Sequence, residues 1–367
     1  MGAIRKAVDM RRASLSICVL LAVLAMVTGC RHSIGPKTVA RDQFDYAQAL
    51  RDAGKEQMLL NMVGLRYSEA PMFLKVTSVI NQYSLEGTVN VLSPPYDGAA
   101  AIGSPVGAGA RFSDRPTLTY IPLSGAEFTK SVLTPIPPKS IMSLIQAGWR
   151  ADLLMRLTVR SINGIAPTSR VGATDADPRF YELVSLMTEV QAAGGLSFRV
   201  EQRGDKEVAL VTMPHNPDDG MQKQRDRIDE MLGIESDLQE YRLVFGQRAS
   251  GPDEIAMLTH SILEMLVDLA QWIDVPPEHE ASGRTRPTPD PEVMESFGFE
   301  PLIRVSYSKN KPEEVFVGVR YEGIWYWIPH DDFRSKRTLS FMQLMFSLAE
   351  SGSGQQAPVV TVGAGGG

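Results

Sequence analysis

Residues 177–212, DPRFYELVSLMTEVQAAGGLSFRVEQRGDKEVALVT, contain the pattern that decides the fold class. Asp177-Pro178 is typical of a helix start, because an acidic cap is followed by a proline in the first turn. Apolar residues then recur every three or four positions, which indicates one buried helical face. They are Phe180, Val184, Met187 and Val190. Gly194-Gly195 predicts the end of this helix.

The second half of the same stretch alternates between apolar and polar residues. Leu196, Phe198 and Val200 occupy every second position, and Val208 and Leu210 do the same further on. The intervening Arg203-Gly204-Asp205 favours a tight turn. Residues 196–210 are therefore predicted to form a β-hairpin.

Similar patterns extend in both directions from this unit. Helices are expected at about 42–66, 219–232, 252–273 and 338–350, with shorter ones after a Ser124/Glu127 capping box and from Pro138. Strands are expected at 72–93, 115–121, 241–245, 301–307, 314–321 and 323–329. Residues 153–162 fit either a helix or a strand. The 252–273 helix has the strongest apolar stripe, with Ser250 and Asp253 as caps. Regular strand–helix alternation is missing. The predicted class is α+β, with mixed helices and antiparallel hairpins in one large or two small domains.

Composition divides the chain into six parts. We expect a signal peptide at 1–29, a tether at 30–41, an α+β body at 42–273, a proline-rich linker or loop at 274–298, a C-terminal β-hairpin plus helix at 299–350 and a flexible tail at 351–367. Residues 94–110 are rich in Gly, Ala and Pro but no lysine follows them, so a surface loop is favoured over a phosphate-binding loop.

The charge balance argues against one class of partner. Residues 1–29 carry four basic residues and one acidic residue, so the remaining chain has 33 basic and 42 acidic residues and a net charge of −9. Binding to phosphate backbones requires a basic face. We therefore expect no nucleic-acid partner.

The N-terminus has the three regions of a secretory signal. Residues 1–12 are basic, residues 15–27 are apolar and uncharged, and small residues follow. The apolar run is shorter than the roughly 20 residues that a spanning helix needs. A cleaved signal is therefore favoured over a membrane span.

Val27-Thr28-Gly29-Cys30 resembles the lipobox of bacterial lipoproteins. The resemblance implies cleavage between Gly29 and Cys30 and a lipid anchor, palmitate included, on Cys30. In such lipoproteins an acidic residue after the cysteine favours the inner membrane, and this chain has Arg31 there. The implied location is the outer membrane, facing the periplasm. Residues 42–93 are similar to uncharacterised proteobacterial lipoproteins, and residues 178–245 resemble ring-forming modules of secretion-system lipoproteins in element order.

Motifs with specific chemistry are missing after Cys30. The histidines are not spaced as zinc ligands, and Gly-x-Ser-x-Gly does not occur at a strand–helix junction. His260 and Glu264 are four apart on the predicted helix, which favours a solvated pair. We expect no catalytic residue, no metal site and no cofactor.

Trp325-Tyr326-Trp327 is the densest aromatic segment. In a strand Trp325 and Trp327 share one face and Tyr326 lies on the other. The two tryptophans are candidate contacts for a sugar or another ligand, while core packing is the alternative.

The sequence thus leaves three functional hypotheses. The first is a non-enzymatic, membrane-anchored envelope lipoprotein that acts as a scaffold, assembly factor or adaptor for an envelope protein partner. The second is a glycan- or ligand-binding envelope module, and the third is an envelope hydrolase with an unrecognised site.

Overall fold

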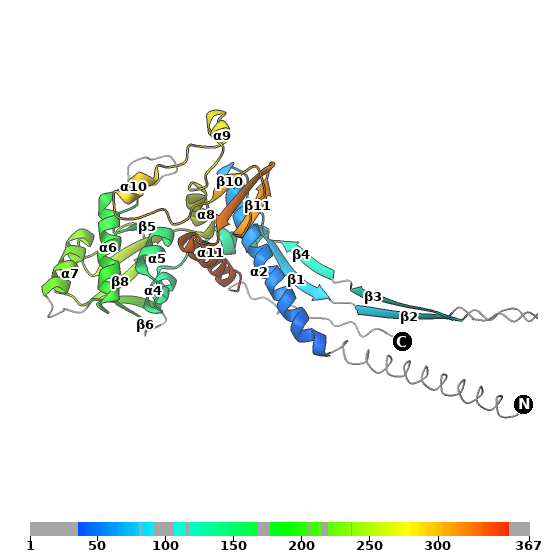
Figure 1. Cartoon of the computed structure of the whole chain (residues 1–367). Coiled ribbons are helices and arrows are strands. Elements are labelled where there is room, and N and C mark those ends of the chain that lie inside the picture. The colour runs from blue at the N-terminus through cyan, green and yellow to red at the C-terminus, as the bar shows by residue number, and fades with distance from the viewer. Residues whose placement is uncertain are drawn as a thin grey trace, which may run out of the picture. The chain divides into compact units, whose positions relative to one another are not determined.

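The computed structural model describes residues 36–80, 83–91, 106–114, 117–167, 177–204, 206–213, 219–235 and 237–351 (Figure 1). The chain divides into two compact units, residues 1–57 and 58–367. The predicted signal peptide, Gly29, Cys30 and the tail from 352 onward lie outside the described residues. Cleavage and lipidation therefore stay predictions.

The first described helix, α2 (Pro36–Arg66), ends where the sequence predicted. It begins at Pro36, inside the range expected as tether, because the first turn of a helix tolerates a proline. In the first unit the side chains described on this helix are exposed or half-buried, and Asp52 pairs with Lys55 at 2.7 Å. From Met58 onward the same helix contributes buried residues to the second unit.

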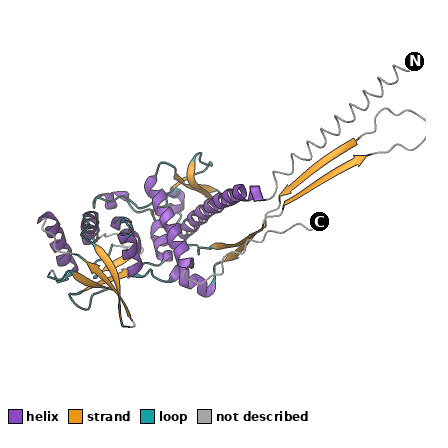
Figure 2. Ribbon diagram, turned by 90° about the horizontal axis from the view of Figure 1, so that it is seen from below, coloured by secondary structure: helices purple, strands orange, loops and turns teal. Residues whose placement is uncertain are grey.

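A five-stranded sheet organises the second unit (Figure 2). Its strands are β5 (Val159–Ile162), β9 (Glu254–Thr259), β8 (Glu240–Phe245), β7 (Lys206–Thr212) and β6 (Ser197–Arg203), in that spatial order. Only β8 and β9 run parallel. The associated helices are α4 (Pro138–Gln146), α5 (Ala151–Thr158), α6 (Pro178–Ala192) and α7 (Asp219–Leu232). The α+β prediction is confirmed.

The helix–hairpin unit at 177–212 also forms as predicted. The Asp177 carboxylate accepts a hydrogen bond from the Arg179 backbone, and α6 buries Phe180, Val184, Met187 and Val190. Strands β6 and β7 pair in register around the 203–206 turn.

The prediction of a helix at 252–273 is wrong for its first half. Residues 254–259 form β9, which lies between β5 and β8, and α8 spans only Ile262–Ala270. Ser261 caps this helix in a capping box with Glu264, so neither Ser250 nor Asp253 is its cap. The short apolar run 255–258 (IAML) fits a central strand as well as a buried helix, and pairing on both sides decided for the strand.

Two antiparallel ribbons are nested in the chain, because the strands of one lie between the strands of the other. Strands β1 (Leu74–Ile80) and β4 (Thr117–Pro122) form one pair, and β2 (Tyr83–Val91) and β3 (Val106–Asp114) form the other. The predicted loop at 94–110 is therefore partly wrong, since 106–110 belong to β3 and pair along β2. Residues 92–105 lie outside the described residues.

The segment after β4 forms α3 (Gly125–Phe128) and a π-helical turn at Thr129–Leu133. The predicted capping box is not formed there. Ser124 makes no side-chain cap, and Glu127 lies 3.6 Å from Lys75.

The C-terminal part contains a three-stranded sheet and a helix. Its strands are β10 (Ser306–Ser308), β12 (Ile324–Pro329) and β11 (Val315–Tyr321), in that order, followed by α11 (Phe333–Ser351). The helix starts earlier than the predicted 338, because the Asp332 carboxylate accepts from the Ser335 backbone at 2.9 Å. The proline-rich segment holds two short helices, α9 (Pro277–Ala281) and α10 (Pro291–Glu295), each with proline at its start.

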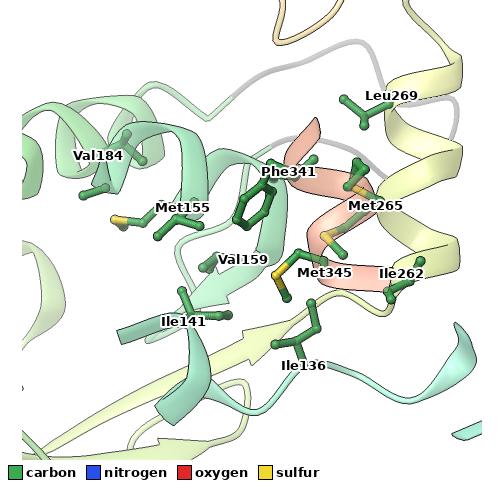
Figure 3. Packing of buried hydrophobic residues seen from close by; sticks show 14 of the residues in the cluster. Ile136, Ile141, Met155, Val159, Val184, Ile262, Met265, Leu269, Phe341 and Met345 are labelled. Atoms are coloured by element: carbon green, nitrogen blue, oxygen red, sulfur yellow. The ribbon is translucent and has the colours of Figure 1, made fainter. Parts of the chain in front are cut away.

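One core joins these elements in the second unit (Figure 3). Phe341 of α11 is fully buried, and its ring centroid lies 5.0 Å from that of Trp149. In Figure 3 it lies between Met155 of α5 and Met265 of α8. The C-terminal helix is thus packed into the same core as the helices of the central sheet.

Candidate ligand-binding cavity

A cavity of about 820 Å³ lies in the second unit, beneath part of the proline-rich segment. Its wall combines the end of α2 with parts of α5, α6 and α8 and residues 286–294. This volume falls in the range typical of small-molecule sites. Arg66, Arg156, Phe180, Tyr181, His260, Asp268, Trp272, Arg286 and Met294 are among the lining residues.

Arg156 is the unusual residue of this wall. It lies in α5 within the apolar stretch LLMRLTV, and its Nη2 donates to the Glu300 carbonyl oxygen at 2.7 Å. Its guanidinium carbon lies 4.8 Å from the centroid of Phe299. Burial lowers the pKa of Arg156 to about 10. Asp152 raises the pKa of this guanidinium from a longer distance, but among the described residues no carboxylate lies within ion-pairing distance of it, so the cavity wall presents a half-buried positive charge without an ion pair.

Another arginine of the wall, Arg66, is buried. Arg66, the last residue of α2, donates from Nε to the Ile273 carbonyl at 3.2 Å and from Nη2 to Thr288 at 2.9 Å. Burial lowers its pKa, although Glu280, 3.7 Å away, opposes this effect. Arg66 therefore fixes the proline-rich segment and adds positive charge to the cavity.

The cavity wall also contains an acidic residue with a shifted pKa, Asp268. Burial raises the pKa of Asp268 to about 6, and the nearby His260 ring partly opposes this shift. His260 Nδ1 lies 3.5 Å from Asp268 Oδ2 and 3.3 Å from the Leu157 carbonyl oxygen. The cavity therefore loses a negative charge when the pH falls through about 6. This arrangement corrects the expected solvated pair, because His260 is buried and precedes α8 rather than facing solvent with Glu264.

Aromatic stacking holds the segment that follows α10 against α6. The rings of Tyr181 and Phe297 stack with centroids 4.9 Å apart and planes at 4°. Phe299 lies 5.7 Å from the same tyrosine ring. The proline-rich segment is therefore a packed loop that forms part of the cavity wall.

A chain of hydrogen bonds connects α9, in the proline-rich segment, to Tyr67 and then to β12. Tyr67 Oη lies 2.7 Å from His279 Nδ1 and 2.6 Å from Tyr326 Oη. Arg284 Nη1 lies 3.1 Å from His279 Nε2, and an arginine can only donate. The proton of His279 is therefore on Nδ1, which donates to Tyr67. Burial raises the pKa of Tyr326, so its hydroxyl stays protonated.

The two tryptophans predicted as ligand contacts lie outside the cavity. Both are half-buried on one face of β12, while Tyr326 lies buried on the other. Trp325 pairs across the sheet with Ser308 and Arg320, and Trp327 pairs with Ser306 and Gly318. Lys311 Nζ lies 5.6 Å from the Trp325 ring, and Trp327 Nε1 has no hydrogen-bond partner among the described residues. Their contact with a ligand stays a prediction.

Two further findings concern membrane and metal sites. None of the helices in the described part of the chain has the length and hydropathy to cross a membrane. Within the same residues, no group of three or more His, Cys, Asp or Glu side chains is placed to hold a metal ion. Asp332, next to His330 and Asp331, instead bonds the backbone and hydroxyl of Ser335.

The cavity was missed by sequence reasoning because its residues come from positions 65 to 302. One signal was present: Arg156 interrupts an apolar run on both sides. A charged residue in such a position is seldom buried without a partner. No protein-family model, curated protein or solved structure matches the chain.

Proposed function

We propose that this chain is a membrane-anchored envelope lipoprotein that binds a small anionic ligand in the 820 Å³ cavity. The observation that carries the ligand proposal is Arg156, a half-buried cation that forms no ion pair with a carboxylate among the described residues. A buried charge is costly unless it is paired. An anion in the cavity supplies that pairing, and charge-assisted hydrogen bonds to a guanidinium are among the stronger ones.

The remaining wall restricts the class of ligand. Phe180, Trp272 and Met294 present apolar surface, while the charged side chains are three arginines and two aspartates, an excess of positive charge. The ligand is therefore an amphiphile with one acidic group, a carboxylate, phosphate or sulfonate, and an apolar part. Such a molecule places its anionic group near Arg156 and its apolar part against the aromatic wall.

Hexanesulfonate is a suitable probe, because its charge does not change between pH 5 and pH 8. Titration calorimetry should give saturable binding of hexanesulfonate and much weaker binding of hexanol, which lacks the charge. Equal binding of the two compounds, or none of either, would refute the proposal. Native mass spectrometry of protein isolated from envelopes then identifies any acidic molecule that purifies with it.

The anchor is a separate part of the proposal and rests on the lipobox residues. Cells fed labelled palmitate should incorporate the label into the wild type and not into Cys30→Ala. The wild type should fractionate with the outer membrane. Labelling of Cys30→Ala, or recovery of the wild type in the soluble periplasm, would exclude a lipid anchor at this residue.

Assembly with an envelope protein partner, the first hypothesis from the sequence, is tested in the same cells. In-cell crosslinking followed by mass spectrometry should identify a defined set of envelope proteins with the wild type. The set should disappear with Cys30→Ala. An anchored wild type that crosslinks to no protein would contradict an assembly role.

A glycan-binding role is a second candidate, favoured by the face around Trp325 and Trp327. Their cross-strand neighbours are mostly small, being Ser306, Ser308 and Gly318, which leaves room for a sugar ring to stack. Pull-down with peptidoglycan should be weaker for Trp325→Ala, while hexanesulfonate binding stays unchanged. Equal retention of variant and wild type would remove this candidate.

A further inference from the structure

Strand β6 (Ser197–Arg203) lies at one edge of the five-stranded sheet. In the described part of the chain β6 pairs along its whole length with β7, and no other strand pairs with it. The register of this pairing has no shift, so no bulge interrupts the strand. An edge strand is a template for pairing with another chain, and natural proteins commonly protect such edges with charges or bulges.

The side chains along this edge are accessible. Ser197, Arg199 and Gln202 are exposed, and Val200 is 46% exposed. Phe198, two positions before Val200 and therefore on the same face of the strand, is buried at 5%. The core of the second unit thus ends between these two residues. It leaves the apolar side chain of Val200 uncovered in the middle of the edge.

Two opposite charges flank Val200. Arg199 precedes it and Glu201 follows it, so both side chains belong to the other face of the strand. Arg199 Nη2 lies 2.8 Å from Glu201 Oε1 and 2.7 Å from Glu240 Oε1. The side chains of Arg199 and Glu201 are 48% and 34% exposed. Ion pairs this exposed contribute little to stability, so they can rearrange at small cost when a second strand arrives.

Val200 is also the middle residue of β6, and this decides how the strand can pair with itself. An antiparallel pair of two β6 strands around a twofold axis through Val200 gives every residue of the strand a partner. Val200 then lies opposite Val200 of the partner subunit. Arg199 lies opposite Glu201 of the partner subunit, once on each side of the axis. Opposite charges at directly paired positions are favourable.

Other registers of the same pair are worse. A twofold axis through Arg199 places two arginines opposite each other, and an axis through Glu201 does the same with two glutamates. Like charges at directly paired positions are destabilising. An axis through Phe198 or Gln202 leaves only residues 197–199 or 201–203 paired. The sequence of β6 is therefore complementary to itself in one full-length register.

We propose that β6 joins two copies of this chain in an antiparallel, edge-to-edge pair centred on Val200, so that two five-stranded sheets become one continuous sheet. The pair covers the exposed Val200 side chain and gives the edge backbone its missing partners. It is short compared with interfaces of about 20–30 residues a side, so the dimer dissociates in dilute solution. This surface is separate from the cavity and its ligand, because no residue of β6 lines the cavity.

Disulfide formation in cells that make the full chain tests the pair. Directly opposed residues of antiparallel strands have Cα atoms about 4.5–5.5 Å apart, which is within the range of disulfides. Val200→Cys should therefore give a disulfide-linked dimer when the cells are treated with copper phenanthroline. The unsubstituted protein controls for crosslinks through Cys30.

Gln202→Cys is the matched control variant. Gln202 is exposed and lies on the same face of β6 as Val200. In the proposed register it lies opposite Phe198 of the partner subunit, so the two copies of residue 202 are four positions, or about 13 Å, apart along the strands. Gln202→Cys should therefore stay monomeric under the same oxidation.

Charge reversal on the Val200→Cys background gives a second readout. Arg199→Glu places glutamate opposite glutamate, and Glu201→Arg places arginine opposite arginine. Each should weaken the pairing about 10-fold, because two attractive pairs become repulsive. Cells that make both variants should recover most of the crosslinked dimer, since the two variants are complementary to each other. Recovery on mixing also excludes misfolding of either variant as the cause of the loss.

Three outcomes would overturn the inference. Val200→Cys that stays monomeric would refute the pair and mean that the charges of β6 protect the edge from association. Dimers of Gln202→Cys in place of Val200→Cys would refute the register. A loss of dimer in Arg199→Glu and Glu201→Arg that mixing does not restore would exclude the proposed charge complementarity.

Discussion

Replacement of Arg156 by methionine should have opposite effects on stability and on ligand binding. Burial lowers the pKa of this guanidinium from 12.5 to about 10. At about 1.4 kcal/mol per pKa unit, the partial burial of this charge costs the native state about 3 kcal/mol. Methionine removes this cost and keeps much of the apolar volume.

The same substitution also removes favourable contacts. The hydrogen bond to the Glu300 carbonyl and the contact with Phe299 together contribute about 2 kcal/mol. Glu300 is exposed, so water can bond its carbonyl oxygen in the variant. Arg156→Met should therefore raise the free energy of unfolding by about 1 kcal/mol, and the melting temperature by about 2 °C.

Ligand binding should respond in the other direction. Loss of a charge-assisted hydrogen bond costs about 1.5–3 kcal/mol, so hexanesulfonate should bind Arg156→Met about 10- to 150-fold more weakly. Differential scanning calorimetry with and without hexanesulfonate measures both effects. Arg160→Met is the matched control, because this arginine is exposed, does not line the cavity and forms an ion pair with Glu264 at 3.2 Å. An Arg156→Met protein that is less stable than the wild type, yet binds hexanesulfonate normally, would refute the reasoning.

Three further predictions follow from the same contacts. Because the pKa of Asp268 is raised to about 6, the native state binds more protons than the unfolded state between pH 4 and 6. The free energy of unfolding of the wild type should therefore fall relative to that of Asp268→Asn as the pH rises through this window. The affinity for hexanesulfonate should fall over the same range in the wild type alone. Parallel pH profiles of the two proteins would contradict this prediction. Tyr67→Phe should lower the free energy of unfolding by about 2 kcal/mol and Tyr326→Phe by about 1 kcal/mol, because Tyr67 bonds two partners; equal losses in urea titrations would argue against the chain of hydrogen bonds. Ser261→Ala should cost about 1 kcal/mol and Ser124→Ala almost nothing, since only Ser261 makes its cap; the reverse order would mean that the caps are misassigned.

Sequence reasoning succeeded where a local pattern and the tertiary packing agreed. Asp177-Pro178 and Gly194-Gly195 delimit α6, and the turn near Gly204 joins β6 to β7, because these residues act through their own backbone. The alternation on β12 similarly separates Tyr326 from the two tryptophans. The α+β class followed from these elements alone.

Prediction from the sequence failed where the same local pattern fits two structures. Ser124 and Ser261 both precede a glutamate by three residues, but the Glu127 carboxylate is directed to Lys75 and only Glu264 completes the box. Residues 254–259 have helical apolar spacing, yet β5 and β8 supply backbone partners on both sides. Local spacing contains no information about such distant partners.

What the sequence by itself determined is the α+β class and the helix–hairpin unit at 177–212, since each depends on residues close together in the chain. The cavity was decided only by the tertiary structure. It brings Arg66, Arg156 and Asp268 into one wall across about 200 residues of sequence. The altered pKa values of these groups have the same origin, because burial depends on what packs around a side chain and not on its neighbours in sequence.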